Sequence, residues 1–312
     1  MELRDIEYFA VVAEHGSVRR ASEALDLSPP ALSKSLRRLE KALQAKLVTR
    51  TPKGIELTPV GTAMLSQVGR IRLTLNDVAR EAADLTRGQT GHLRIAASPA
   101  VGEELPAAYA ILAKNASEVT FQVATMDNDE SMPLLLKGEL DLIFNYIDCL
   151  PGYPLNGLTH EHLYDEFVVV CAAANHRLAG LKRVPLAELA QERWAATNPR
   201  LLNVQWLHKA FQDRGLPPPR AAIEARSIHL RLQAIAVSTL VGYVPGRVLA
   251  RAGAALRLKE LPVPELRWRR PVGVIYRDGG YLSPAARRFI EILKTASKEL
   301  ATAKAMMNRG RK

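Results

Sequence analysis

The chain has 312 residues, of which 47% are hydrophobic and 24% charged, and its formal net charge is +11. This length leaves room for about two domains, and the composition excludes a fibrous or largely disordered protein. No apolar run is long enough to span a membrane and the start of the chain lacks a secretory signal pattern, so we expect a cytoplasmic protein without membrane contact. Cys149 and Cys171 form no C-x-x-C spacing, so neither a disulfide framework nor a metal site is indicated.

The positive charge is concentrated in the second half of the chain. Residues 1–58 carry +2 (10 basic, 8 acidic), residues 59–90 carry +1 and residues 91–163 carry −7, whereas residues 164–267 carry +7 and residues 268–312 carry +8. Such an excess suggests a polyanionic partner. Because most of it lies far from the N-terminus, an argument for DNA binding there has to depend on motif pattern.

Three short helices are predicted in the first 45 residues. The first ends before Gly16, Ser17 can cap the second, and Ser28 can cap a third that has Pro29 in its first turn. The apolar stripe of the third helix predicts its buried side and consists of Leu32, Leu36, Leu39 and Leu43.

The opposite face of the third helix is polar and basic. It presents Pro29, Pro30, Ser33, Lys34, Arg37, Arg38 and Lys41. Two short helices joined by a tight turn, the second with such a face, fit a helix-turn-helix placed for the major groove. A small helical bundle with an ordinary basic surface fits the same spacing.

Residues 46–50 and 55–58 predict two short strands around a turn that contains Pro52 and Gly54. This hairpin would form a wing. Its cations Arg50 and Lys53 would lie beside the DNA backbone or minor groove, where they neutralise phosphate and release counterions.

The segment SVRRASEALDLSPPALSKSLRRLEKALQAKLVTRTPKGIELTPVG resembles the winged helix-turn-helix of LysR-type transcriptional regulators. The matching residues are Ala21, Ala24, Leu25, Ser28, Pro30, Ala31, Leu32, Ser33, Leu39, Glu40, Leu47, Arg50, Leu57, Thr58 and Gly61. Two positions depart from the family pattern: Pro29 replaces a usual glutamine, and Gln44-Ala45 replaces the usual glycine before the wing. Because Pro29 has no polar side chain, any base contact there must be apolar. The expected DNA-binding residues are Ser28, Pro29, Pro30, Ser33, Lys34, Arg37, Arg38, Arg50 and Lys53.

From residue 59 to about residue 86 the pattern is that of one long helix. Its apolar residues follow a heptad seam of Met64, Val68, Ile71, Leu75, Val78, Ala82 and Leu85. The seam predicts a partner helix and hence a homodimer, although packing on the chain's own second domain is an alternative. Two wings on one dimer would favour approximately palindromic DNA. Residues 87–91 are expected to form a flexible boundary.

After residue 91, short apolar runs alternate with helical stretches, which predicts an α/β fold. The expected strands are residues 93–97, 119–125, 140–146, 167–172, 194–197, 240–244 and 271–276. The expected helices include residues 105–115, 204–214 and 284–300.

The LysR resemblance extends, more loosely, through GHLRIAAS, KGELDLIF, FVVVCAAANHRLAG and LVGYVPG. It implies two lobes similar to type II periplasmic solute-binding proteins, joined by crossings near residues 158–165 and 261–268. The implied division is a DNA-binding domain (1–58), a linker helix (59–90) and an effector-binding domain (91–312). Within the last, lobe I comprises 91–163 and 268–300, lobe II 164–267, and a basic, solvated tail 301–312.

Ligands of such folds bind beyond the carboxyl ends of strands, where short polar side chains and helix N-termini converge. The residues expected there are Ser98, Pro99, Ala100, Met126, Asn128, Asn145, Thr197, Asn198, Arg226, Ser227 and Pro245. Ser98 is expected to cap a helix whether or not it binds a ligand, so a purely structural role for it stays open. Arg226 could pair with a ligand carboxylate or form a surface salt bridge.

No catalytic or cofactor motif is found, and the His160-Glu161-His162 cluster lacks metal-ligand spacing, so neither an enzyme nor a cofactor is expected. We expect a regulator, dimeric or tetrameric, that binds double-stranded promoter DNA, responds to a small-molecule inducer and acts on RNA polymerase. Two alternatives are a nucleoid-like architectural protein without an effector, and an enzyme or solute-binding protein with an accessory helical domain.

Overall fold

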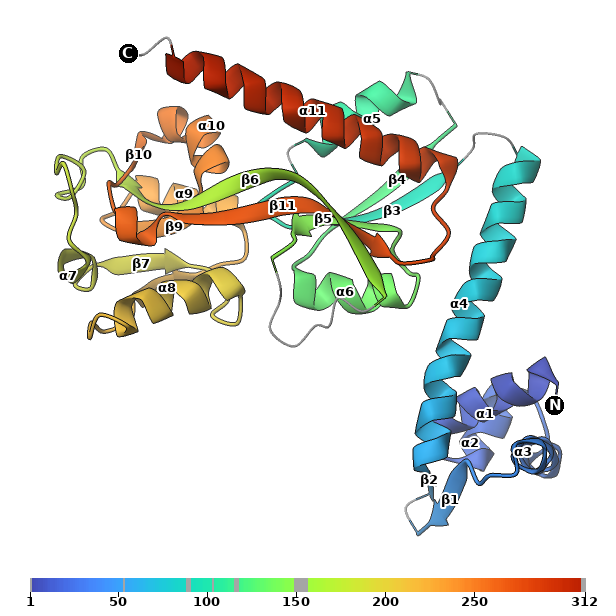
Figure 1. Cartoon of the computed structure of the whole chain (residues 1–312). Coiled ribbons are helices and arrows are strands. Elements are labelled where there is room, and N and C mark those ends of the chain that lie inside the picture. The colour runs from blue at the N-terminus through green and yellow to red at the C-terminus, as the bar shows by residue number, and fades with distance from the viewer. Residues whose placement is uncertain are drawn as a thin grey trace. The chain divides into compact units, whose positions relative to one another are not determined.

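The computed structural model (Figure 1) describes residues 2–52, 54–87, 91–102, 104–114, 118–148 and 157–309, with side chains to residue 86 in the second range and to residue 297 in the last. Contacts within the chain divide it into two units, Met1–Ala83 and Asp84–Lys312. Lys53, Cys149 and residues 88–90, for which the sequence made predictions, lie outside the described residues.

The first unit is a helix-turn-helix bundle followed by a hairpin and a long helix, as predicted. Its elements are α1 (Leu3–His15), α2 (Val18–Ala24), α3 (Pro29–Leu43), β1 (Val48–Thr51), β2 (Gly54–Leu57) and α4 (Pro59–Arg87), which ends in the second unit. The antiparallel wing pairs Val48 with Leu57 and Thr51 with Gly54, one to two residues off the predicted strand limits.

The helix boundaries form where the sequence carries capping residues. The Ser17 hydroxyl accepts from Arg20 N and the Ser28 hydroxyl from Ala31 N, which satisfies amides that have no partner inside the helix. Gly16 closes α1 with a left-handed backbone (φ 59°), a conformation that glycine adopts without a steric cost.

The core of the first unit joins α1, α3, the wing and the start of α4. Phe9, Leu32, Leu39 and Leu47 are completely buried. Three predictions for this region are corrected. Leu43 is 36% exposed, whereas the predicted stripe placed it inside. Val68, predicted for the dimer seam, is 1% exposed and packs in this core, as Met64 does in part, because the first turns of α4 cover α1 and α3.

Glycine allows the wing to approach the bundle closely. Ile55 N donates to Gly16 O at 2.9 Å, and a Cβ at Gly54 would lie 2.4 Å from that same oxygen. A Cβ at Gly61 would lie 2.0 Å from Leu47 O. Any larger residue would push the wing or α4 away, which explains glycine at these positions in physical terms.

The described residues of the second unit form nine strands, of which eight lie on a continuous path, and helices on both sides of the sheet (Figure 1). Its first half comprises β3 (His92–Ala97), α5 (Leu105–Ala113), β4 (Thr120–Thr125), α6 (Asn128–Leu136), β5 (Leu142–Tyr146) and β6 (Leu158–Ala173). Its second half comprises α7 (Leu186–Leu189), β7 (Arg193–Ala196), α8 (Leu202–Gln212), β8 (Arg220–Glu224), α9 (Ile228–Ala236), β9 (Val241–Pro245), α10 (Gly246–Leu256), β10 (Leu258–Glu260), a 3-10 turn (Pro264–Leu266), β11 (Trp268–Arg277) and α11 (Pro284–Arg309).

The strand order is β4-β3-β5-β11-β6-β9-β7-β8, with β10 on β6. Lobe I is built on β3, β4 and β5, and lobe II on β7, β8 and β9. The two long strands β6 and β11 belong to both lobes and pair antiparallel from Trp268 opposite Val168 to Arg277 opposite Leu158. The second crossing therefore begins with β11 itself, later than the expected 261–268.

Each lobe has a core on both faces of its sheet. In lobe I, α5 and α11 cover one face around Phe144 and Phe289, and α6 covers the other around Leu135. In lobe II, α8 packs its Phe211 against Trp194, while α9 and α10 pack over Cys171 on the opposite face. The sequence predicted a helix after Ser227, which is α9, and only the end of β6. It did not predict α6, α7, α10, β8 or β10.

Candidate functional site

The first candidate site is the outer face of α3 with the adjoining wing. Ser28, Pro29, Pro30, Lys34, Arg37, Arg38 and Arg50 are exposed, and Ser33 is half-buried. Ser33, Arg37 and Arg50 line one groove of about 390 Å³ between α3 and the hairpin. Among the described residues, Lys34, Arg37 and Arg50 have no acidic partner, so their charge is available to an anion.

Arg38 differs from the other basic residues of this face. Its Nε donates to Asp5 Oδ2 at 2.8 Å, and its Nη2 pairs with Asp5 and Glu2. Ser35 Oγ also donates to Asp5, at 2.5 Å. The Arg38 guanidinium, helped by Ser35, holds the pKa of the fully buried Asp5 at about 2. Arg38 thus joins α3 to α1, and only its exposed side remains for DNA.

Glu40 attaches the wing to α3. Its Oε1 accepts from Leu47 N at 3.0 Å and its Oε2 pairs with Lys46 Nζ at 2.8 Å. Thr58 then caps α4 by accepting from Gly61 N, and donates its hydroxyl hydrogen to Lys46 O. These contacts fix the position of Arg50 relative to Arg37, since both side chains project from elements that Glu40 connects.

The second candidate site is the cleft between the lobes, a cavity of about 70 Å³. The structure brings eight of the predicted effector residues to it: Ser98, Pro99, Ala100, Asn128, Asn145, Thr197, Arg226 and Pro245. Ser227 lines an adjoining, larger apolar hollow of about 850 Å³ and caps α9 through Leu230 N. Met126 and Asn198 line neither cavity.

Ser98 does not cap a helix, contrary to the prediction. Its hydroxyl accepts from Ala100 N at 3.2 Å in the turn after β3, and α5 begins only at Leu105. Asn145 and Asn128 bond to each other at 2.6 Å, and each also binds the backbone of Tyr146. The amides of these two residues are therefore largely occupied in holding the cleft wall.

Sequence reasoning missed the cationic and aromatic members of the cleft: Tyr146, Arg231, Tyr243 and Arg270. Arg270 lies on the crossing strand β11, forms a two-pronged ion pair with Asp148 at 2.6 and 2.7 Å, and stacks 3.8 Å above the Tyr146 ring. Burial raises the pKa of Tyr146, so its hydroxyl stays neutral. An arginine within the apolar stretch HLRLQAIA was the available signal for Arg231.

Arg226 crosses the mouth of the cleft. From lobe II it pairs with Glu130 at 2.7 and 2.8 Å and with Asp127 at 3.3 Å, both in lobe I. The bond to Glu130 raises the pKa of Arg226, while burial raises the pKa of Asp127 above its ordinary value. In this state the guanidinium is engaged by the chain's own carboxylates.

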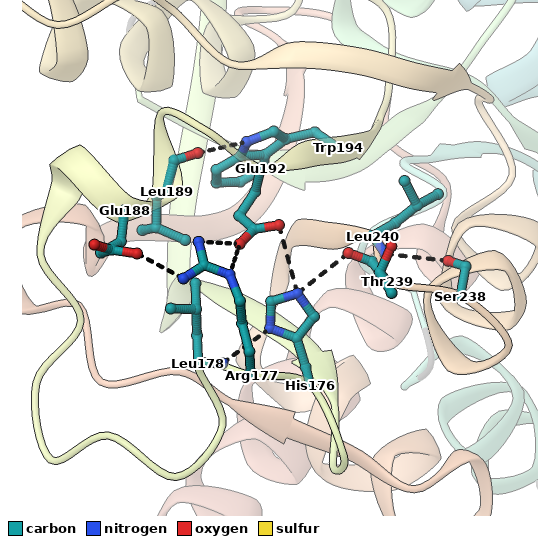
Figure 2. A network of polar contacts seen from close by, with 10 residues as sticks. All are labelled: His176, Arg177, Leu178, Glu188, Leu189, Glu192, Trp194, Ser238, Thr239 and Leu240. Carbon is teal, nitrogen blue, oxygen red and sulfur yellow. Dashed lines mark hydrogen bonds and ion pairs between the residues drawn. The ribbon is translucent and has the colours of Figure 1, made fainter.

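A further polar cluster lies away from the cleft in lobe II (Figure 2). His176 Nδ1 accepts from Leu178 N at 3.2 Å and its Nε2 donates to Thr239 O at 3.2 Å, while Arg177 joins Glu188 and Glu192. The network ties the loop after β6 to α7 and to the turn before β9. Its side chains are saturated by these contacts, which indicates a structural role.

Within the residues that the structure describes, no group of histidine, cysteine and carboxylate side chains is arranged to hold a metal ion. Burial raises the pKa of the Cys171 thiol to about 12, so it is not a nucleophile. None of the described helices has the length and apolar character of a membrane span.

Two family models match this chain. Residues 3–62 match the bacterial regulatory helix-turn-helix protein of the lysR family, and residues 86–298 match the LysR substrate binding domain. Among curated proteins, the RuBisCO operon transcriptional regulator of Allochromatium vinosum is 28% identical over 295 residues, covering 94% of this chain and 95% of that protein. The SDS degradation transcriptional activation protein of Pseudomonas sp. is 30% identical over 290 residues, covering 91% and 93%.

Solved structures share the fold. Full-length CbnR in complex with its target DNA has a TM-score of 0.57 at 23% identity, covering 95% of this chain and 99% of that one. The CcmR regulatory domain of Synechocystis PCC6803, in complex with 2-PG, has a TM-score of 0.61 at 20% identity, covering 67% and 98%. The winged helix-turn-helix and the two-lobed unit together define the class of the protein: a DNA-binding transcriptional regulator with an effector-binding domain, and not an enzyme. The chain belongs to the LysR family of such regulators.

Proposed function

We propose that this LysR-family chain is the subunit of a homodimer or homotetramer that binds double-stranded promoter DNA and changes transcription when a small inducer occupies the cleft. The division into residues 1–58, 59–90 and 91–312 belongs to this proposal, as do contact with RNA polymerase and work in the cytoplasm. A ligand has this effect only if it binds the two arrangements of the subunits unequally.

One observation supports the assignment of the DNA-binding surface. Lys34, Arg37 and Arg50 are exposed, lack acidic partners in the described part of the chain, and two of them line one groove beside the N-terminal half of α3. Cations on a helix and its wing can contact phosphates on both sides of a major groove while Ser33 and the prolines face base edges.

Charge reversal tests this surface. We expect the triple variant Lys34→Glu, Arg37→Glu, Arg50→Glu to lose specific promoter binding in a footprinting assay. The matched control reverses three exposed cations of the second unit, Lys182, Arg193 and Arg220, and should keep it. Equal loss in both variants would indicate a bulk charge effect, and undiminished binding by the first would refute the proposed surface.

Salt dependence gives a second, quantitative measure. The logarithm of the affinity should fall with the logarithm of salt concentration at a slope of about −0.9 for each phosphate neutralised. Replacing Lys53 of the wing by alanine should flatten that slope by about one. A complex that is insensitive to salt would contradict the backbone contacts.

A further inference from the structure

Arg231 is a buried cation that has no counterion among the residues that the structure describes. It lies in the first turns of α9, is 5% exposed and lines the cleft. Its Nε is enclosed without any hydrogen-bond acceptor, and among the described residues no carboxylate pairs with its guanidinium. Burial lowers the pKa of Arg231, but arginine stays protonated at neutral pH.

Two other arginines between the lobes, the buried Arg270 and the half-buried Arg247, are neutralised. Asp148 pairs with Arg270, and Glu104 pairs with Arg247 at 2.7 Å. Asp127 is the carboxylate that interacts electrostatically with Arg231, but Asp127 is hydrogen-bonded to Arg226. Since an enclosed charge is costly without a partner, the cleft lacks one negative group.

Resting on the proposed function, we infer that the inducer is a compact oxyanion, a carboxylate or phosphate, whose oxygens pair with the Arg231 guanidinium. A planar guanidinium binds both groups through two parallel hydrogen bonds. The Tyr146 hydroxyl is also buried, has no hydrogen-bond partner in the described part of the chain and remains neutral, so it supplies one more donor. Thr197, 6% exposed, lines the same wall.

The size of the cavity restricts the ligand further. The volume of about 70 Å³ corresponds to about five to seven water-sized groups. A short mono- or dicarboxylate or a phosphate fits this space, whereas a larger acid would have to extend into the adjoining apolar hollow.

Binding by the full-length protein tests the inference. Acetate, malonate, succinate and inorganic phosphate are titrated at constant ionic strength, with malonamide as the neutral counterpart of malonate. Tryptophan fluorescence follows unfolding of the second unit, since Trp194, Trp206 and Trp268 all lie there. We expect at least one anion to raise the melting temperature by several degrees in a saturable manner, and malonamide to have no effect.

Substitution assigns the effect to Arg231. Arg231→Met should weaken the binding of that anion at least tenfold and should raise the melting temperature without ligand, because an unpaired buried charge is removed. The matched control Arg220→Met, at an exposed arginine of the same lobe, should change neither. A merely structural Arg231 would instead lower the melting temperature when replaced.

The outcomes distinguish failure of the oxyanion assignment from failure of the proposed function. If no anion binds, if malonamide binds as well as malonate, or if Arg231→Met binds the anion normally, the oxyanion assignment is overturned. The proposed function then stands as long as the wild-type chain still binds promoter DNA. Loss of DNA binding by the wild type would instead count against the proposed function.

Discussion

Gln44 ends α3 in the left-handed region, with φ 51°, in the Gln44-Ala45 turn that replaces the usual glycine of the family pattern. A residue with a side chain is destabilised in this conformation by about 1–2 kcal/mol relative to glycine. Glycine has the larger conformational entropy in the unfolded state, which cancels part of this difference. We therefore expect Gln44→Gly to stabilise the first unit by about 1 kcal/mol, measured by calorimetry of the full chain. Lys41→Gly, in the last turn of the same helix, should destabilise it by about 1 kcal/mol. Equal effects of the two substitutions would contradict the argument.

Asp5 gives the first unit a pH dependence. The pKa of Asp5 is about 2 in the folded protein, below the ordinary 3.8. Its contribution to the free energy of unfolding is therefore complete above pH 3.8 and disappears as the pH falls toward 2. With half-exposed Arg38 as the partner, we expect about 1–2 kcal/mol. Asp5→Asn should lose this amount at pH 7 and make stability less sensitive to acid. Calorimetry at pH 7 and pH 3 checks this, with Glu7→Gln as an exposed control.

Several residue-level predictions depended on local chemistry and were therefore accessible. Ser17, Ser28 and Gly16 act within a few residues of their own position, so the sequence carries the whole signal. Arg38 was not distinguishable from Arg37, because the partner that separates them, Asp5, lies 33 positions away. Arg231 was missed for the same reason: what defines it is enclosure by segments from both lobes.

At the level of elements, α4 divides into a buried and an exposed part. Val68 belongs to the core of the first unit, whereas Leu75, Val78 and Leu85 are 45%, 58% and 80% exposed. We expect Leu75→Lys together with Val78→Lys to dissociate the oligomer in sedimentation velocity, since two charges would enter an apolar seam. Asn76→Lys, on the neighbouring exposed face, should leave the mass unchanged. An intact oligomer in the double variant would show that this seam is not an interface.

The missed elements have recognisable causes. α6 contains Pro133, which argues against a helix in a local pattern, and the first half of β6 carries His160, Glu161 and His162 among its apolar residues. Tertiary pairing with β11 overrides that local polarity. The strands that bear the predicted cleft residues were found because their apolar runs are continuous.

In the second unit as a whole, the ion pair of Arg226 with Glu130 joins the two lobes. Its side chain is 52% exposed and that of Glu130 is 45% exposed, so the pair should add less than about 1 kcal/mol to stability. We expect Arg226→Gln to change the fluorescence-detected unfolding little but to broaden the distance between the lobes. Spin labels at Lys137→Cys and Arg220→Cys, in a Cys149→Ser background, measure that distance. An unchanged distribution would show that the pair does not restrain the cleft.

The pairing of β6 with β11 extends through both lobes, with one register shift between Val272 and Gly273, and limits how such a unit can respond. Because ten residue pairs join these strands from one lobe into the other, opening the cleft cannot proceed as a free swing about a flexible joint. It has to occur as torsion of a hydrogen-bonded ribbon, which keeps its amides protected while the lobes rotate. The twist would be distributed along the ribbon without breaking its hydrogen bonds, so the slowest-exchanging amides of the unit should lie where the two halves are joined.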